Sequence, residues 1–132
     1  MKLNELRQIR EDLNFLEEKY DVIVYGSYVE GSMRPNSDID ISILSYETKN
    51  GENIEILKKF LGKFPLKYDI RIFELFPIYI QISIIENYQV IFGDPLEISE
   101  YFYSFRKMWD DCKYRIFSNQ FSSYSERLSL IK

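Results

Sequence analysis

Apolar residues recur along the chain at two spacings, which predict helices and strands in turn. Over residues 2–19 they return every three or four positions between charged residues, and this spacing predicts an amphipathic helix. Residues 52–62 repeat the pattern and predict a second helix that ends at Gly62. Short apolar runs predict four strands, at residues 22–25, 39–44, 66–73 and 89–92.

The second half of the chain contains one ambiguous segment and one long helical pattern. In residues 76–87 isoleucines alternate as in a strand, yet Pro77 and the spacing of the same isoleucines also fit a helix, so both remain open. Ser99 is a predicted N-cap, and aromatic residues after it repeat at helical spacing. Residues 118–132 are serine-rich and aperiodic, which is typical of a mobile tail or of a segment ordered by a partner.

The order of these elements predicts one α/β (α+β) domain: a small mixed β-sheet flanked by helices, with a C-terminal helix. A chain of 132 residues is long enough for one core and too short for two. We expect the core in residues 1–95, a helix packed on the core or on a partner in residues 96–117, and the tail in residues 118–132.

The amino-acid composition excludes several kinds of binding and catalysis. The formal net charge of −4 argues against a general nucleic-acid binder, which usually presents a basic surface. The chain has no histidine, so Ser-His-Asp and Cys-His catalysis are excluded, and acid–base work falls to carboxylates, lysine or tyrosine. It has one cysteine, no visible signal peptide and no apolar run of about 18 residues, so we expect a cytoplasmic protein that does not span a membrane.

The strongest chemical signal lies at the start of the second predicted strand. Alternation places Asp38, Asp40 and Ser42 on one face of it, with isoleucines on the other. Two carboxylates about 6–7 Å apart on one strand face repel each other, and a divalent cation makes such an arrangement useful. The turn at Gly26–Ser27 offers backbone N–H groups to an anion. Together these features suggest a site for a metal–nucleoside triphosphate.

Other residues could join this site or could have ordinary structural roles. Asp69 lies on the polar face of the third predicted strand, whereas its neighbour Glu74 lies off that face. Taken alone, each aspartate could be a surface acid, and Ser27 could be a helix cap. Arg34 and Arg71 could contact phosphate or the acceptor, or could be solvated or ion-paired.

The motif Gly26-Ser27, followed by Asp38-Ile39-Asp40 and then by Asp69, resembles the nucleotidyltransferase superfamily that includes DNA polymerase beta. It looks most like the minimal nucleotidyltransferases (MNT), the antitoxins paired with HEPN-domain toxins. FPIYIQISIIENYQVIFGDP and YFYSFRKMWDDCKYRIF are similar to the C-terminal part of these antitoxins, so the resemblance covers residues 5–117. It implies a DNA polymerase beta-like nucleotidyltransferase fold.

The resemblance also implies a reaction: Mg²⁺-dependent transfer of AMP from ATP to a tyrosine of a partner HEPN ribonuclease toxin, by which the chain acts as an antitoxin. In this reading Asp38 and Asp40 hold two Mg²⁺ ions, and Asp69 completes the second metal site and takes the proton of the attacking hydroxyl. Gly26, Ser27 and Arg34 bind the nucleotide.

The chain departs from the family pattern at one place. Residues 28–33 are predicted to form a short helix, and many relatives have an arginine just before its glycine, where this chain has Glu30. Loss of that cation weakens the expectation of tight nucleotide binding. A catalytically weak or inactive subunit that neutralises its partner by binding alone therefore stays open, as does nucleotidyl transfer to a small molecule.

Overall fold

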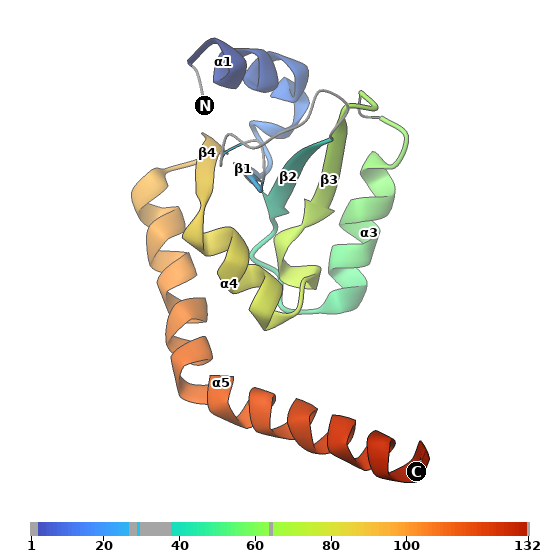
Figure 1. The fold of residues 1–132 in the computed structure, drawn as a ribbon. Helices are drawn as coiled ribbons and strands as arrows, with labels where there is room; N and C mark the ends of the chain where they lie inside the picture. Colours follow the sequence, from blue (N-terminus) through green and yellow to red (C-terminus); the bar gives the residue numbers. More distant parts are fainter. Residues whose placement is uncertain (1–2, 27–28, 30–37, 64, 132) are drawn as a thin grey trace.

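The computed structural model of the chain describes residues 3–26, 29, 38–63 and 65–131, and the surroundings of side chains as far as residue 113 (Figure 1). The elements, in order, are helix α1 (Leu3–Asp12), a 3₁₀ turn (Asn14–Leu16), β1 (Asp21–Tyr25), β2 (Ile39–Leu44), α3 (Asn50–Phe60), β3 (Tyr68–Ile72), a second 3₁₀ turn (Phe73–Leu75), α4 (Ile78–Glu86), β4 (Tyr88–Phe92) and α5 (Pro95–Ile131).

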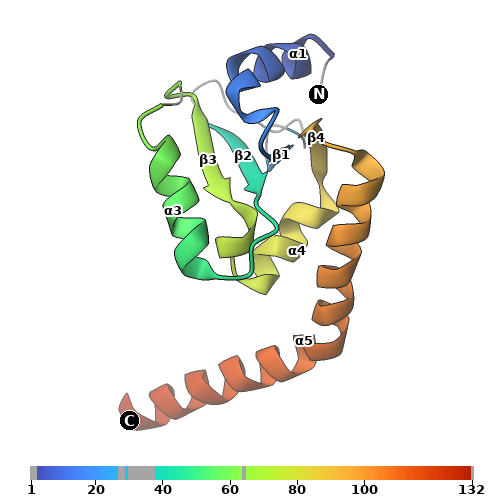
Figure 2. The ribbon, with the colours of Figure 1, turned by 180° about the vertical axis from the view of Figure 1, so that it is seen from behind.

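The four strands of the described residues form one mixed sheet in the order β3-β2-β1-β4, which confirms the predicted fold class. β1 pairs antiparallel with both β2 and β4, whereas β2 and β3 are parallel. Parallel neighbours need a crossover connection, and α3 supplies it. Figures 1 and 2 both show α3 beside β3, at one edge of the sheet.

Helices cover the sheet on two faces, and each face has its own apolar cluster. On one face, residues of α1 and α3 pack against the isoleucines of β2 and β3, Ile41, Ile43, Ile70 and Ile72 among them. On the other face, α4 and α5 pack against Ile23, Leu44 and Phe73. Among the described residues, no helix is both long enough and apolar enough to cross a bilayer.

The first helix is shorter than its pattern predicts. α1 ends at Asp12, and the 3₁₀ turn at Asn14–Leu16 follows it. Leu13 has non-helical backbone angles (φ −112°, ψ 17°), and both Leu13 and Leu16 are fully buried. The prediction of one helix over residues 2–19 is therefore wrong in extent. The backbone changes from α-helix to a 3₁₀ turn, which directs these two leucines into the core.

The ambiguous segment at residues 76–87 is a helix. Ile82, Ile84 and Ile85 of α4 are buried against the sheet. Pro77 precedes the first helical residue with φ −65°, which suits a helix start. The amide of the buried Gln81 donates a hydrogen bond to the Phe73 carbonyl at 3.1 Å. Helical packing thus satisfies the one polar side chain that the helix buries, Gln81.

The C-terminal helix begins earlier than Ser99. Its first residue is Pro95, and the Asp94 carboxylate accepts a hydrogen bond from the Leu96 N–H at 2.9 Å, so Asp94 is the N-cap and the prediction of Ser99 is wrong. α5 then continues to Ile131, which makes residues 118–131 helical. Figure 1 shows α5 bending and extending away from the sheet.

Glu74 links α5 to the end of β2. Its Oε1 accepts hydrogen bonds from the N–H and hydroxyl of Ser45 at 3.0 and 3.1 Å. Its Oε2 accepts from the Tyr46 N–H at 3.1 Å and from the Tyr101 hydroxyl of α5 at 2.7 Å. Burial and the Glu74 contact raise the pKa of Tyr101, so this hydroxyl stays a donor. Glu74 therefore has a structural role.

Candidate functional site

Tyr25, Asp40 and Asp69 form a row across three neighbouring strands. In the antiparallel pair Tyr25 is the register partner of Asp40, and in the parallel pair Asp40 is the register partner of Asp69. Register partners on adjacent strands project from the same face of a sheet. The structure thus brings together two of the three predicted carboxylates, on the face that α4 and α5 cover further along.

Asp38 and Ser42 flank Asp40 on the same strand face, as the alternation predicted. Asp38 is exposed and lies one residue before β2. Ser42 is fully buried, and its hydroxyl has no hydrogen-bond partner among the described residues. As far as the described residues show, this face is therefore exposed at the start of β2, at Asp38, and is covered further along by the apolar cluster of α4 and α5.

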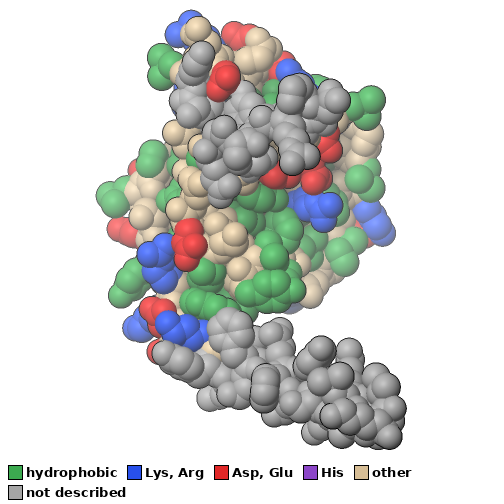
Figure 3. All heavy atoms as spheres, viewed as in Figure 1, with side chains coloured by type: hydrophobic (Ala, Val, Ile, Leu, Met, Phe, Trp, Pro, Cys, Tyr) green, Lys and Arg blue, Asp and Glu red, His purple; other side chains and the backbone are tan. Residues whose placement is uncertain are grey.

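Burial has the largest effect on the pKa of Asp40, and repulsion from the neighbouring carboxylates has the next largest. Partial burial raises the pKa of Asp40, and the nearby charges of Asp69 and Asp38 raise it further, while Arg71 lowers it. Arg71 Nε lies 3.3 Å from Asp69 Oδ1, and the two side chains are 60% and 37% exposed. Arg71 therefore offsets part of the negative charge and remains accessible. Figure 3 shows acidic and basic side chains close together above an exposed hydrophobic area.

Gly26 allows the Asp40 carboxylate to lie directly against the backbone. The glycine has φ +79°, a conformation that other residues adopt only with strain. A Cβ atom at this position would lie 2.5 Å from Asp40 Oδ2. Both the turn at the end of β1 and the position of Asp40 thus depend on the absence of a side chain at Gly26.

The other predicted nucleotide-binding residues, Ser27 and Arg34, lie outside the described residues, as does Glu30. Among the residues that are described, no three histidine, cysteine or acidic side chains are grouped closely enough to hold a metal ion as they stand. The Asp40–Asp69 pair nevertheless fits a divalent cation, because hard oxygen donors are what Mg²⁺ prefers and a cation would relieve their repulsion.

Tyr25 is the member of the site that sequence reasoning missed. Its half-buried ring meets the ring of Phe76 edge to face, with centroids 6.4 Å apart. Burial and the charges of Asp40 and Asp69 raise the pKa of its hydroxyl, which therefore stays protonated beside them. The pairing of β1 with β2 places Tyr25 beside Asp40. From the sequence alone, Tyr25 is identified only as the last residue of a buried strand.

Comparison with known proteins agrees with this geometry. The nucleotidyltransferase domain family matches residues 6–91. A protein of Methanocaldococcus jannaschii with the name "Putative protein adenylyltransferase MJ1547" is 46% identical over 111 residues, which are 84% of this chain and 86% of that protein.

Solved structures share the fold. A chain of the "toxin-antitoxin with AMP-PNP" crystal structure aligns with a TM-score of 0.67 at 17% identity, over 90% of this chain and 98% of that chain. A chain of the complex described as "tri-AMPylated Shewanella oneidensis HEPN toxin in complex with MNT antitoxin" aligns with a TM-score of 0.53 at 16% identity, over 91% and 99%. The sequence match over most of the core, with the carboxylate pair at the edge of the sheet, shows that this chain belongs to the nucleotidyltransferase domain family.

Proposed function

We propose that this nucleotidyltransferase is a Mg²⁺-dependent protein adenylyltransferase that acts as an antitoxin by transferring AMP to a tyrosine of a HEPN-domain partner. The observation that carries the proposal is the register pairing of Asp40 with Asp69, with the Asp40 carboxylate in the space that a side chain at position 26 would need. The names of a relative and of a structural neighbour, an adenylyltransferase and a HEPN–MNT complex, support the choice of AMP and of the partner.

Three carboxylates, Asp38, Asp40 and Asp69, would hold the metal. When bound, Mg²⁺ supplies positive charge that neutralises the triphosphate and the departing pyrophosphate. Ser27 and Arg34 are proposed to bind the nucleotide, together with the backbone at Gly26.

Asp69 is the proposed base. Its side chain is 37% exposed, so an incoming hydroxyl can reach it. Arg71 contacts Oδ1 at 3.3 Å, which orients the carboxylate and leaves Oδ2 outside that contact. The tyrosine hydroxyl gives its proton to Asp69 as its oxygen bonds to the α-phosphorus, and the bond from that phosphorus to pyrophosphate breaks.

The acceptor comes from another molecule in this proposal. The structural neighbours are complexes of a toxin with an antitoxin, which supports a separate protein as the source of the acceptor tyrosine.

The direct test is the mass of the partner. The chain is incubated with Mg²⁺, ATP and a HEPN-domain partner protein, and the partner should gain about 329 Da per AMP, located on a tyrosine. Omission of Mg²⁺ is the control. A partner whose mass is unchanged after complete incubation excludes the proposal.

Glu30, which replaces the usual arginine, favours one second candidate: a subunit that neutralises its partner by binding without transfer. The triple variant with Asp38, Asp40 and Asp69 replaced by asparagine separates the two. It should still neutralise the partner if binding suffices and should fail to do so if transfer is required.

A further inference from the structure

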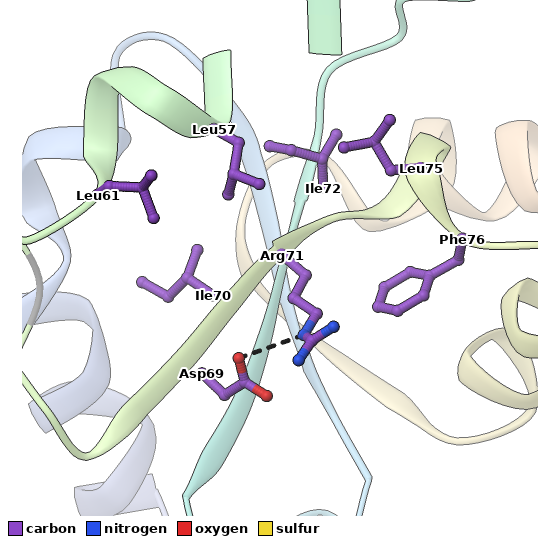
Figure 4. A pocket seen from close by; sticks show the side chains of 8 residues that line it. All are labelled: Leu57, Leu61, Asp69, Ile70, Arg71, Ile72, Leu75 and Phe76. Carbon is purple, nitrogen blue, oxygen red and sulfur yellow. Dashed lines mark hydrogen bonds and ion pairs between the residues drawn. The ribbon is translucent and has the colours of Figure 1, made fainter. Parts of the chain in front are cut away.

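A cavity of about 290 Å³ lies along the free edge of β3 (Figure 4). The four consecutive residues from Asp69 to Ile72 line it. Successive residues of a strand point to opposite faces, so a cavity lined by four in a row follows the edge of the strand instead of covering one face. β3 is the last strand in the sheet order, so within the described part of the chain no strand neighbours this edge.

The backbone of β3 presents hydrogen-bonding groups to the cavity. The Ile39 N–H donates to the Lys67 carbonyl at 2.8 Å, so the backbone groups of Lys67, and of every second residue after it, are directed toward β2. The N–H and C=O of the intervening Ile70 are therefore directed away from β2. A strand edge of this kind is a template for a further extended segment.

The side chains at this edge differ between its two sides. Leu57 of α3 and Leu61, the residue after α3, lie on the same side as Ile70, as Figure 4 shows, and Leu61 is 65% exposed. Asp69, Arg71 and Phe76 lie on the other side. An occupying strand would have alternating requirements: an apolar side chain toward the leucines, and polar side chains toward Asp69 and Arg71.

We propose that the free edge of β3 docks an extended segment of the partner protein, which pairs with β3 and carries the acceptor tyrosine to Asp69. The proposal rests on the proposed function and names how its acceptor is held. Charge and position favour a polypeptide as the occupant. The Arg71 guanidinium contacts Asp69 through Nε and is 60% exposed, so it would also pair with an acidic side chain of the segment, and the backbone edge would pair with the segment's amides. The residue next to the tyrosine is apolar and enters between Leu57 and Leu61.

Steady-state kinetics of AMP transfer to the HEPN-domain partner protein test this docking. Leu61→Asp should raise KM for that protein at least about tenfold, with kcat and KM for ATP nearly unchanged, because the variant removes binding area and leaves the carboxylates intact. Leu96→Asp is the matched control, since Leu96 is 67% exposed on α5 and does not line the cavity. Equal KM values for the two variants would overturn the proposal. A rise confined to KM for ATP would also overturn it and would assign the cavity to the nucleotide.

Amide exchange gives a readout that does not need the reaction. Exchange of the Ile70 N–H should slow at least about tenfold when the HEPN-domain protein is added without ATP, because pairing protects that amide. Unchanged exchange overturns the docking even if AMP transfer occurs. Slowed exchange with no AMP transfer supports the docking and excludes the proposed reaction, so the two failures are distinguishable.

Discussion

Asp40 and Asp69 are register partners in the parallel pair of β2 and β3, although 28 residues separate them in the sequence. Neither side chain is fully exposed, and the charge of Asp69 adds to the burial that raises the pKa of Asp40. The consequences of this relationship can be measured separately for catalysis and for stability.

Replacement of Asp69 by asparagine should lower the rate of AMP transfer at least about a thousandfold, roughly 4 kcal/mol of barrier, because the proposed base and a metal ligand are lost together. The rate is measured as AMP added to the HEPN-domain partner over time. Asp110→Asn is the control, because this carboxylate is 62% exposed on α5 and belongs to no described part of the site. A retained rate in the Asp69 variant would remove Asp69 from the mechanism.

Replacement of Asp40 by asparagine should stabilise the protein in the absence of metal. The folded state raises the pKa of Asp40, so the charged carboxylate opposes folding. This cost is complete above the folded pKa, shrinks as the pH falls below it and vanishes below the unfolded pKa. The variant should therefore melt at a higher temperature than the original chain at pH 7 and at nearly the same temperature near pH 3.

Added Mg²⁺ provides the second half of this test. It should raise the melting temperature of the original chain and leave that of the Asp40 variant nearly unchanged. A variant that is less stable than the original chain at pH 7 without metal would contradict the electrostatic account of the site.

Replacement of Gly26 by alanine should destabilise the fold by at least about 1–2 kcal/mol, because the backbone there has φ +79° and the new Cβ meets the Asp40 carboxylate. Gly51→Ala is a matched control: its Cβ meets nothing within 4 Å, and the residue lies in α3, so stability should rise by up to about 1 kcal/mol. Thermal denaturation compares the two. Equal melting temperatures would show that the glycine at the turn is not required.

Replacement of Glu74 by glutamine should cost about 2–3 kcal/mol of unfolding free energy in urea titration, since one of its two acceptor oxygens becomes a donor facing other donors. Four hydrogen bonds from Ser45, Tyr46 and Tyr101 converge on this carboxylate. Glu100→Gln, at an exposed position of α5, controls for the loss of charge. An equal loss in both variants would mean that charge, and not the hydrogen-bond set, matters.

The local pattern of apolar and polar residues was sufficient to predict much of the fold and part of the candidate site. Strict alternation in β2 and β3 placed Asp40 and Asp69 on polar strand faces, and the structure confirms this. Tyr25 required the pairing of β1 with β2, which no local pattern encodes. The role of Glu74 also depends on contacts across the chain, since its partners are 27 to 29 residues away.

The ends of helices, and the type of a segment whose residue spacing fits both a helix and a strand, were harder to predict. The isoleucine-rich α4 satisfies both a two-residue and a helical repeat, and only the packing of its buried side chains against the sheet selects the helix. At Leu13 tertiary packing ends a helix that the amphipathic pattern would continue. Both differences arise because burial against the rest of the molecule decides between locally acceptable conformations.

The crossover through α3 also determines when the carboxylate pair can exist. β1 and β2 are antiparallel neighbours with a shorter connection, while Asp69 joins Asp40 only when α3 has closed the longer β2–β3 connection. Loop closure over a long connection costs entropy and comes late in folding. A nascent or partly unfolded chain in which β3 is not yet paired with β2 therefore lacks the carboxylate pair. Nucleotidyl transfer is then expected only from chains that have completed this part of the fold.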